Sequence, residues 1–257
     1  MTHPYLVGTA HPRVLAHRGL VHRGPLHDDE FVVENSFAAI AAAHAAGADY
    51  VESDCHLTAD GHVVLFHDDT LERVTGDPRP LAAVTLRELE LLMADRGGLA
   101  TLAQTLEAFP TTRFNLDVKA PAAAVPLGRM IAEHADRVLV TSFSDARRRA
   151  ALAAAAPALP ATSPGTGTVA LLVAAVALHL KPLATRLLRG LDALQIPERR
   201  GAVRVLSPRL LAWAHESGVE VHVWTVNDAE RMRELVAMGV DGIVTDVADV
   251  ALETLAR

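Results

Sequence analysis

Short runs of apolar and β-branched residues alternate along this chain with longer stretches rich in alanine and leucine. The short runs predict buried strands, and the longer stretches predict helices. Some helical stretches follow a capping residue and end at glycine, as at Ser207-Pro208 and Gly218, which is typical of helix starts and ends. The pattern therefore predicts a regular alternation of strands and helices over most of the 257 residues.

This alternation predicts eight strands and eight helices. The strands are expected at 13–17, 50–55, 114–119, 138–142, 161–163, 193–196, 220–226 and 242–246. The helices are expected at 36–46, 102–109, 122–135, 145–156, 168–189, 208–217, 228–238 and 248–255. Eight such units in about 250 residues indicate an α/β fold of the (β/α)8 TIM-barrel type, and a doubly wound open sheet is the runner-up. We expect one domain that spans residues 1–257.

One segment interrupts the alternation after the second strand. The turn at 58–61 contains Asp-Gly and leads into the apolar run Val63-Val64-Leu65-Phe66, which is typical of a β-hairpin rather than a helical crossover. The returning strand would bring His67 close to the level of Glu52 and Asp54. We therefore expect a hairpin arm that places a histidine and two acids at one end of the barrel.

Two predicted strands carry ionisable residues spaced two apart, namely Glu52 with Asp54 and Asp117 with Lys119. Side chains with this spacing share one face of a strand. Two carboxylates on one face repel each other unless a cation lies between them, and a hard divalent cation suits carboxylate oxygens. The pattern therefore indicates a metal site. A solvent-exposed edge strand and a plain Asp117–Lys119 ion pair are the alternatives.

Residues with ionisable, hydroxyl or aromatic side chains gather at the predicted C-terminal ends of the strands, where barrels of this kind build their active sites. They are His17, Glu52, Asp54, Asp117, Lys119, Ser142, Trp224 and Asp246. A lone histidine is more often structural than catalytic, but His17 and His67 each close a strand and precede a charged residue. Trp224 fits a substrate contact and a buried barrel tryptophan equally well.

Composition limits the classes of partner and the cellular compartment that we expect. The net charge of −7 argues against nucleic acid as the main partner. The single cysteine, Cys55, excludes an intrachain disulfide and a cysteine-rich zinc site. No secretory signal is expected in residues 1–13, and the longest apolar run, 169–180, is too short to span a bilayer. We therefore expect a cytoplasmic protein without a transmembrane segment.

Arginines are concentrated in the middle and later part of the chain. They are Arg147, Arg148, Arg149, Arg186, Arg189, Arg199 and Arg200. We interpret them as solvated helix faces, and a weak patch for anionic head groups is the alternative.

The order of short motifs resembles the glycerophosphodiester phosphodiesterase family. The motifs are Leu15-Ala16-His17-Arg18-Gly19, Glu34-Asn35-Ser36, Gly47-Ala48-Asp49-Tyr50-Val51-Glu52-Ser53-Asp54, Thr58-Ala59-Asp60-Gly61, His67-Asp68, Leu71-Glu72-Arg73, Asn115-Leu116-Asp117-Val118-Lys119, Ser142-Phe143, Trp224-Thr225-Val226-Asn227 and Gly239-Val240-Asp241-Gly242-Ile243-Val244-Thr245-Asp246. Each motif alone is weak, but the ordered set covers nearly the whole chain and is highly specific.

The resemblance implies a TIM barrel that hydrolyses a small-molecule glycerophosphodiester to an alcohol and glycerol 3-phosphate, which is a phosphoric diester hydrolase. It implies one divalent metal ion, Mg²⁺ or Ca²⁺. By resemblance, His17 and His67 form a general acid–base pair. The resemblance likewise implies that Glu52, Asp54 and Asp117 hold the metal, that Arg18 and Lys119 face the phosphate, and that Trp224 contacts the glycerol or leaving-group side. Glu34 and Asn35 are expected near the site without an assigned role.

Three features depart from the family pattern. The third metal ligand is usually glutamate, whereas Asp117 is one methylene shorter; the related sphingomyelinase D branch also looks to use aspartate there. A second His-Arg-Gly occurs at residues 22–24, and we choose His17 because it closes an apolar strand. The stretch 156–191 carries no clear family motif, so we expect it to influence substrate choice.

Two other functions remain open at this point. Asp117 and the apolar run 169–180 are compatible with a phospholipase D-like activity on lysophospholipids or sphingolipids. The change at Asp117 is also compatible with a non-catalytic barrel that binds phosphodiesters. The sequence leaves the alcohol, the preferred cation, a cyclic phosphate intermediate and the oligomeric state open.

Overall fold

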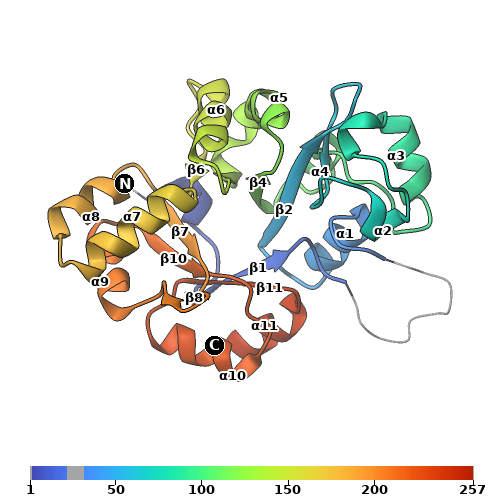
Figure 1. The fold of residues 1–257 in the computed structure, drawn as a ribbon. Coiled ribbons are helices and arrows are strands. Elements are labelled where there is room, and N and C mark those ends of the chain that lie inside the picture. The colour runs from blue at the N-terminus through green and yellow to red at the C-terminus, as the bar shows by residue number, and fades with distance from the viewer. Residues whose placement is uncertain (1, 22–31, 257) are drawn as a thin grey trace.

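A ring of parallel strands surrounded by helices forms the centre of the molecule (Figure 1). The computed structural model describes residues 2–21 and 32–256. The parallel strands are β1 (Arg13–His17), β2 (Tyr50–Leu57), β4 (Arg113–Val118), β5 (Val138–Thr141), β6 (Ala161–Thr162), β7 (Ala193–Ile196), β10 (Glu220–Val223) and β11 (Gly242–Thr245). They pair in the order β6-β5-β4-β2-β1-β11-β10-β7. The predicted (β/α)8 barrel is therefore confirmed over the open sheet.

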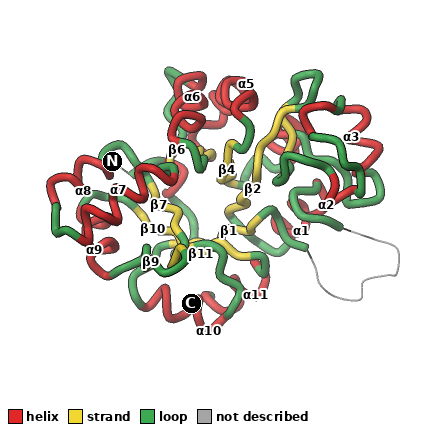
Figure 2. Tube along the Cα trace, in the orientation of Figure 1, coloured by secondary structure: helices red, strands yellow, loops and turns green. Residues whose placement is uncertain are grey.

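Figure 2 shows the helices, in red, as the outer layer around the strands, in yellow. They are α1 (Phe37–Ala45), α2 (Glu72–Thr75), α3 (Leu86–Met93), α4 (Leu102–Ala108), α5 (Ala124–Ile131), α6 (Asp145–Ala155), α7 (Thr166–Ala177), α8 (Lys181–Leu188), α9 (Pro208–Glu216), α10 (Ala229–Ala237) and α11 (Ala248–Leu255). The strands between them are buried on both faces, which explains their nearly continuous apolar sequences. No helix in the described ranges is both long enough and apolar enough to cross a bilayer.

The strand register sets the ionisable residues at common levels. His17 pairs with Glu52 across β1 and β2, and Glu52 pairs with Asn115 across β2 and β4. Two residues further along, Asp54 pairs with Asp117. Register partners on neighbouring parallel strands point to the same side of the sheet. The register thus brings two layers of polar side chains together at the C-terminal end of the barrel.

Strands β6 and β7 lie at the two ends of the pairing series, and hydrogen bonds beside the strands join them. The Asp192 N–H donates to the Thr162 carbonyl at 3.0 Å, and the Thr162 N–H donates to Asp192 Oδ2 at 2.9 Å. The Gln195 N–H donates to Ser163 Oγ at 3.0 Å. These contacts nearly close the barrel.

The hairpin arm consists of the second half of β2 and of β3 (Val63–Leu65). The two strands are antiparallel, with Cys55 opposite Leu65, and the Phe66 N–H donates to the Asp54 carbonyl at 2.9 Å. The arm packs its own apolar cluster, which includes Val64 and Leu71, against α3. This pairing returns the chain to the level of Asp54, so the next residue, His67, lies at the same end of the barrel as the acids.

Two helix predictions were wrong in detail, and two helices were missed. The helix expected over 168–189 is two helices, α7 and α8, because the chain turns at His179, whose φ is +60°, and α8 then begins at Lys181 with Pro182 in its first turn. The helix expected over 122–135 gives way to a 3₁₀ helix at Ala132–Arg137. Helices α2 and α3 were not predicted.

The interpretation of Arg199 and Arg200 as part of a helix face was also wrong. They form β8 (Arg199–Arg200), which pairs antiparallel with β9 (Val203–Arg204). The two-residue connection contains Gly201 with φ of +59°, as a tight hairpin requires. This small hairpin stands at the mouth of the barrel, outside the main sheet.

Candidate active site

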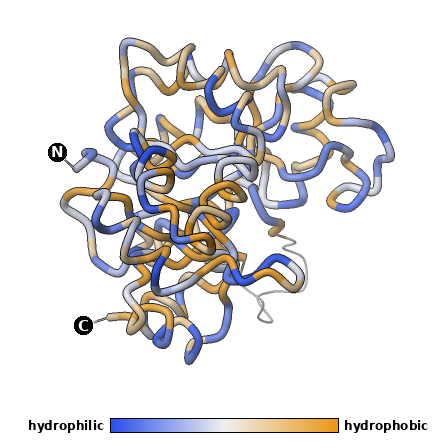
Figure 3. The backbone as a smooth tube through the Cα atoms, turned by 60° about the vertical axis from the view of Figure 1, so that its left-hand side comes forward, coloured by the Kyte–Doolittle hydropathy of each residue, from blue (hydrophilic) through white to orange (hydrophobic). Residues whose placement is uncertain are grey.

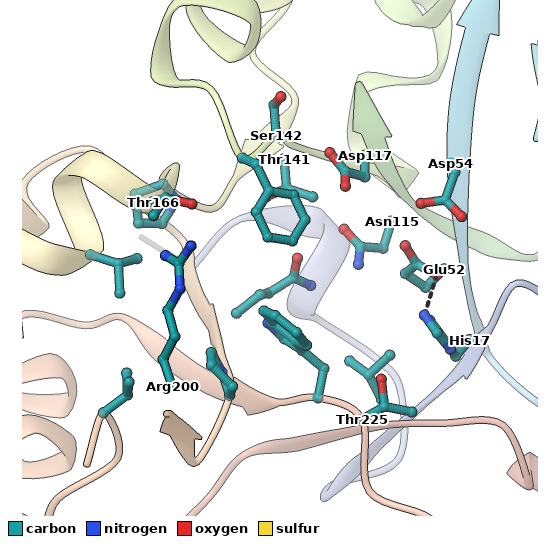
Figure 4. Close-up of a pocket in the computed structure, with 18 of the residues that line it drawn as sticks. His17, Glu52, Asp54, Asn115, Asp117, Thr141, Ser142, Thr166, Arg200 and Thr225 are labelled. Atoms are coloured by element: carbon teal, nitrogen blue, oxygen red, sulfur yellow. Dashed lines mark ion pairs between the residues drawn. The ribbon is translucent and has the colours of Figure 1, made fainter. Parts of the chain in front are cut away.

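A cavity of about 750 Å³ opens at the C-terminal ends of the strands (Figure 4). Its lining contains every residue of the predicted site: His17, Arg18, Glu52, Asp54, His67, Asp117, Lys119 and Trp224. The structure therefore brings the set together from β1, β2, β4, β10 and the arm. The alternative that Glu52 and Asp54 lie on an exposed edge strand does not hold, because β2 lies between β1 and β4. The second His-Arg-Gly, at residues 22–24, lies outside the described residues.

His17 is held by a carboxylate at one ring nitrogen and faces a second carboxylate with the other. Its Nδ1 lies 2.6 Å from Asp246 Oδ1, and its Nε2 lies 3.8 Å from Glu52 Oε2. Burial lowers the pKa of His17, but the hydrogen bond to Asp246 and the charge of Glu52 outweigh burial and raise that pKa above its usual value. Asn227 Nδ2 donates to Asp246 Oδ2 at 2.7 Å and keeps the acid in place.

The two residues after His17, Arg18 and Gly19, both have left-handed backbone, and the position of Gly19 has no room for a side chain. Arg18 has φ of +58°, and its N–H donates to the Glu52 carbonyl at 2.8 Å. Gly19 has φ of +86°, and a Cβ at this position would lie 2.6 Å from the carbonyl carbon of Ala39. Glycine is therefore required on two counts, backbone conformation and space. This requirement explains the glycine of the His-Arg-Gly motif.

Asp54 is surrounded by hydrogen-bond donors and cations. Lys119 Nζ lies 2.9 Å from Asp54 Oδ1, Arg18 Nε lies 3.0 Å from Oδ2, and Asn35 Nδ2 donates to Oδ2 at 3.0 Å. Burial raises the pKa of Asp54, but the charges of Lys119 and Arg18 outweigh burial and hold the pKa below its usual value. Asp54 is therefore ionised, and Asn35, which had no assigned role, orients it.

The other two acids are less well compensated. Burial, together with the charge of Asp54, raises the pKa of Glu52 to about 8. Burial also raises the pKa of Asp117, although Lys119 Nζ donates to Asp117 Oδ2 at 2.6 Å. Three buried carboxyl groups thus share two neighbouring cations, Lys119 and Arg18, so the ionisation of all three together favours the arrival of a further cation.

The donor atoms at this point suit a hard divalent cation. Asp117 Oδ1 and Asn115 Oδ1 are buried and have no hydrogen-bond partner among the described residues. Carboxylate and amide oxygens are the ligands of Mg²⁺ and Ca²⁺. In the described part of the chain, however, no three acidic or histidine side chains already form a cage, and Lys119 lies between Asp54 and Asp117. The chemistry fits a metal ion, and the ligand set of Glu52, Asp54 and Asp117 stays a prediction.

A chain of charged side chains connects His67 to Arg18, the residue that follows His17. Its Nδ1 lies 2.5 Å from Asp68 Oδ1, and Arg73 Nε donates to Asp68 Oδ2 at 2.6 Å. Glu34 Oε1 accepts from Arg73 at 2.6 Å and from Arg18 at 2.8 Å. The Arg73 hydrogen bond, with that of His67, lowers the pKa of Asp68 to about 2. Glu34 therefore links the two histidine-bearing segments, a role that the sequence did not indicate.

Two aromatic rings, those of Phe143 and Trp224, line the cavity. Phe143 and Trp224 meet edge to face with ring centroids 5.9 Å apart, and Lys119 Nζ lies 5.1 Å from the Phe143 centroid. Trp224 also packs against the cluster inside the barrel, so it is both a cavity wall and a partly buried barrel residue. Ser142 donates to the Val118 carbonyl at 2.7 Å, which gives its hydroxyl a structural use.

Sequence reasoning did not place several residues in the cavity lining, among them Asn115 and Arg200. Asn115 had a usable signal, because it lies two residues before Asp117 and shares its face of the strand. Arg200 had none beyond the glycine at the hairpin turn, since its position depends on how β8 and β9 fold over the barrel mouth.

Comparison with known proteins agrees with this geometry. The sequence model of the glycerophosphoryl diester phosphodiesterase family matches residues 17–250. The chain is 35% identical over 245 residues to a probable glycerophosphodiester phosphodiesterase 2 of Mycobacterium tuberculosis, covering 94% of this chain and 89% of that protein.

Solved structures share the fold. A glycerophosphodiester phosphodiesterase from Thermotoga maritima matches with a TM-score of 0.73 and 23% identity, covering 97% of this chain and 100% of the other. A phosphodiesterase from Oleispira antarctica, solved with the product sn-glycerol-3-phosphate, matches with a TM-score of 0.72 and 21% identity, covering 96% of this chain and 98% of the other.

Proposed function

The chain belongs to the glycerophosphoryl diester phosphodiesterase family and is thus a phosphoric diester hydrolase, and we propose that it cleaves glycerophosphodiesters with a divalent metal ion and two histidines. The products would be an alcohol and glycerol 3-phosphate. Glycerophosphocholine and glycerophosphoethanolamine are the substrates to test first. We expect the whole predicted domain, residues 1–257, to carry this activity.

The reaction needs positive charge around a phosphate whose anionic oxygens repel a nucleophile. A bound metal ion would neutralise part of that charge, and Glu52, Asp54 and Asp117 would hold it. Arg18 suits two-point contact with phosphate oxygens, whereas Lys119 supplies a point charge. Both cations form ion pairs with Asp54, so the phosphate of a substrate would compete with Asp54 for them.

The two histidines would divide the proton transfers. One accepts a proton from the attacking hydroxyl, and the other gives a proton to the leaving alkoxide, each worth about 10²–10⁴-fold in rate. Asp246 fixes the ring of His17, and Asp68 fixes the ring of His67. The attacking group is either water or the neighbouring glycerol hydroxyl, and the latter gives a cyclic phosphate that water opens. Detection of a cyclic product by phosphorus NMR separates the two routes.

One observation carries this proposal: His17, Glu52, Asp54 and Asp117 occupy matched levels on three neighbouring strands and face one cavity. Structural ion pairs alone do not require such an arrangement at the catalytic end of a barrel. The cavity also contains Lys119, a cation suited to the phosphate.

The test is release of glycerol 3-phosphate from a panel of glycerophosphodiesters. The protein is assayed with EDTA and again after Mg²⁺, Ca²⁺ or Mn²⁺ is restored, beside the His17→Ala variant. Turnover that returns with metal and is absent from the variant supports the proposal. Metal-dependent binding without multiple turnover would favour a barrel that only binds phosphodiesters. Full activity in EDTA would contradict the proposed requirement for a metal ion.

A further inference from the structure

His67, one of the two proposed proton carriers, lies just past the end of the β2–β3 pairing. The last main-chain hydrogen bond between these segments runs from the Phe66 N–H to the Asp54 carbonyl, at 2.9 Å. His67 itself makes no main-chain to main-chain hydrogen bond with any residue in the described ranges. Figure 3 shows hydrophobic and hydrophilic segments alternating along the chain, and here the apolar run 63–66 gives way to three hydrophilic residues, 67–69. The position of His67 therefore depends on contacts with side chains.

A buried histidine of β2 contacts the main chain at this point. His56 Nε2 lies 3.1 Å from the carbonyl oxygen of His67, and because a carbonyl oxygen only accepts, Nε2 is the donor. His56 is 3% exposed and stands opposite Val64 in the β2–β3 register. It does not line the cavity. The ring N–H of His56 thus extends the hairpin by one hydrogen bond beyond the last backbone pair.

The ring and the main chain of His67 are held by different contacts. The ring is held through Asp68, which forms an ion pair with Arg73, whose side chain is 52% exposed. Exposed ion pairs hold a position only weakly. The main chain is held by His56, which is buried and belongs to β2. His56 therefore gives the firmer link between His67 and the strand that carries two of the proposed metal ligands.

We propose that His56 is a positioning residue for proton transfer by His67, and that its hydrogen bond sets the distance between His67 and the reacting phosphate. This inference rests on the proposed function and adds to it a residue outside the cavity. A proton donor or acceptor works only within hydrogen-bond reach of the reacting oxygen, about 2.6–3.2 Å. A misplacement of about 1 Å lowers a rate by up to about 10²-fold. Loss of the donor should therefore act on kcat, whereas Arg18 and Lys119, which would face the phosphate, keep KM nearly unchanged.

The test replaces His56 by side chains that keep or remove the donor. His56→Gln keeps an N–H group at about the same reach, His56→Phe keeps a ring without the donor, and His56→Leu removes both. The substrate is glycerophosphocholine, and the readout is release of glycerol 3-phosphate. We expect kcat to fall about 10- to 100-fold in the phenylalanine and leucine variants, with KM within about twofold of wild type. In His56→Gln, kcat should stay within about threefold of wild type.

A double-mutant cycle separates positioning from a general loss of stability. In the His67→Ala background, measured at raised enzyme concentration, His56→Phe should lower kcat by less than about twofold, because no imidazole is left to position. A fall as large as in the wild-type background would overturn the proposal. Circular dichroism melting establishes that each variant is folded at the assay temperature.

His62→Phe is the matched control, because His62 lies beside the turn of the same arm, its side chain is 52% exposed and it does not line the cavity. It should leave kcat and KM within about twofold of wild type.

Four results would overturn the positioning role while the wild-type protein is active, and they leave the proposed function intact. They are equal losses of kcat in His56→Gln and His56→Phe, a rise in KM at constant kcat, a lower melting temperature without loss of kcat, and unfolding of both apolar variants. An inactive wild-type protein would instead contradict the proposed function and, with it, the role of His56.

Discussion

The imidazole of His17 and the carboxylate of Asp246 form a 2.6 Å hydrogen bond between the ends of β1 and β11, the first and last strands of the barrel. The bond leaves Nε2 of His17 directed toward Glu52 and the cavity. Asp246 also accepts a hydrogen bond from the side-chain amide of Asn227, so two residues from different segments hold the ring of His17. Nε2 of His17 is therefore positioned by the pairing of the first and last strands of the barrel.

Asp246→Asn should lower kcat about 10²-fold with a much smaller change in KM, because the amide no longer fixes the tautomer and direction of His17. Asp246 raises the pKa of His17. Its loss should therefore move the limb of the pH–rate profile that reports His17 to lower pH, whether the histidine acts as acid or base. Steady-state kinetics from pH 5 to 9 measure both effects, and an unchanged profile would show that Asp246 has only a structural role.

Metal binding should be visible in stability without any assay of activity. Mg²⁺, Ca²⁺ or Mn²⁺ should raise the Tm of the EDTA-treated protein, because a ligand that binds only the folded state stabilises it. Asp54→Asn and Asp117→Asn should abolish this shift, whereas Asp117→Glu should retain it along with activity. Glu107→Gln, at an exposed position of α4, is the control and should shift like the wild type. A full shift in Asp54→Asn would rule out the proposed ligand set.

Gly19→Ala should destabilise the fold and greatly reduce activity, because the new methyl group would lie 2.6 Å from the Ala39 carbonyl carbon. Gly190→Ala separates this clash from backbone strain, since Gly190 has φ of +76° with open space around its Cβ position. Left-handed backbone costs an alanine about 1–2 kcal/mol. Urea unfolding should show about that loss for Gly190→Ala and a clearly larger loss for Gly19→Ala. Equal losses would mean that the backbone at Ala39 moves freely.

A buried ion cluster at the opposite end of the barrel should set the acid stability. Arg13 donates to both oxygens of Glu220 at 2.6 and 2.7 Å, and His222 Nε2 lies 3.1 Å from Glu220 Oε2. Burial raises the pKa of Glu220, but Arg13 and His222 outweigh it and lower that pKa to about 2. The pair therefore stabilises the fold above pH 4.5, the usual pKa of glutamate, and loses its effect as the pH falls toward 2.

Glu220→Gln should accordingly reduce the free energy of unfolding by about 3 kcal/mol at pH 7, because it leaves a buried arginine without a counter-charge. The difference from wild type should shrink between pH 4.5 and 2. Denaturant unfolding at several pH values measures it. Glu216→Gln, which removes an exposed partner of Lys181, is the control and should have almost no effect. A difference that stays constant with pH would contradict the ionic origin.

The sequence predicted the barrel well because each strand is a short apolar run buried on both faces. The shared face of Glu52 and Asp54, and that of Asp117 and Lys119, could be anticipated, because spacing by two places both side chains on one side of a strand. The hairpin arm followed from its Asp-Gly turn. These features depend on local chemistry, which a single sequence displays directly.

Features that depend on distant contacts could not be predicted. Glu34 gains its role only when Arg18 and Arg73, from different segments, reach the same carboxylate oxygen. The apolar run 169–180 suggested one long helix, but the chain turns at His179, and no local signal indicated that α7 would border the cavity. The β8–β9 hairpin is too short for an alternating pattern, so the position of Arg200 was missed.

The hairpin arm places the two histidines of the proposed acid–base pair in parts of the fold with different freedom to change. His17 stands on a central strand of the barrel, whereas His67 stands just beyond β3, on an excursion with a small core of its own. Insertions or substitutions in the arm beyond Cys55 would shift His67 while His17, Glu52 and Asp117 keep their positions on the barrel strands. Descendants of this chain could thus change their speed of turnover and still recognise the same phosphate, because evolution can act on the arm as a separate module.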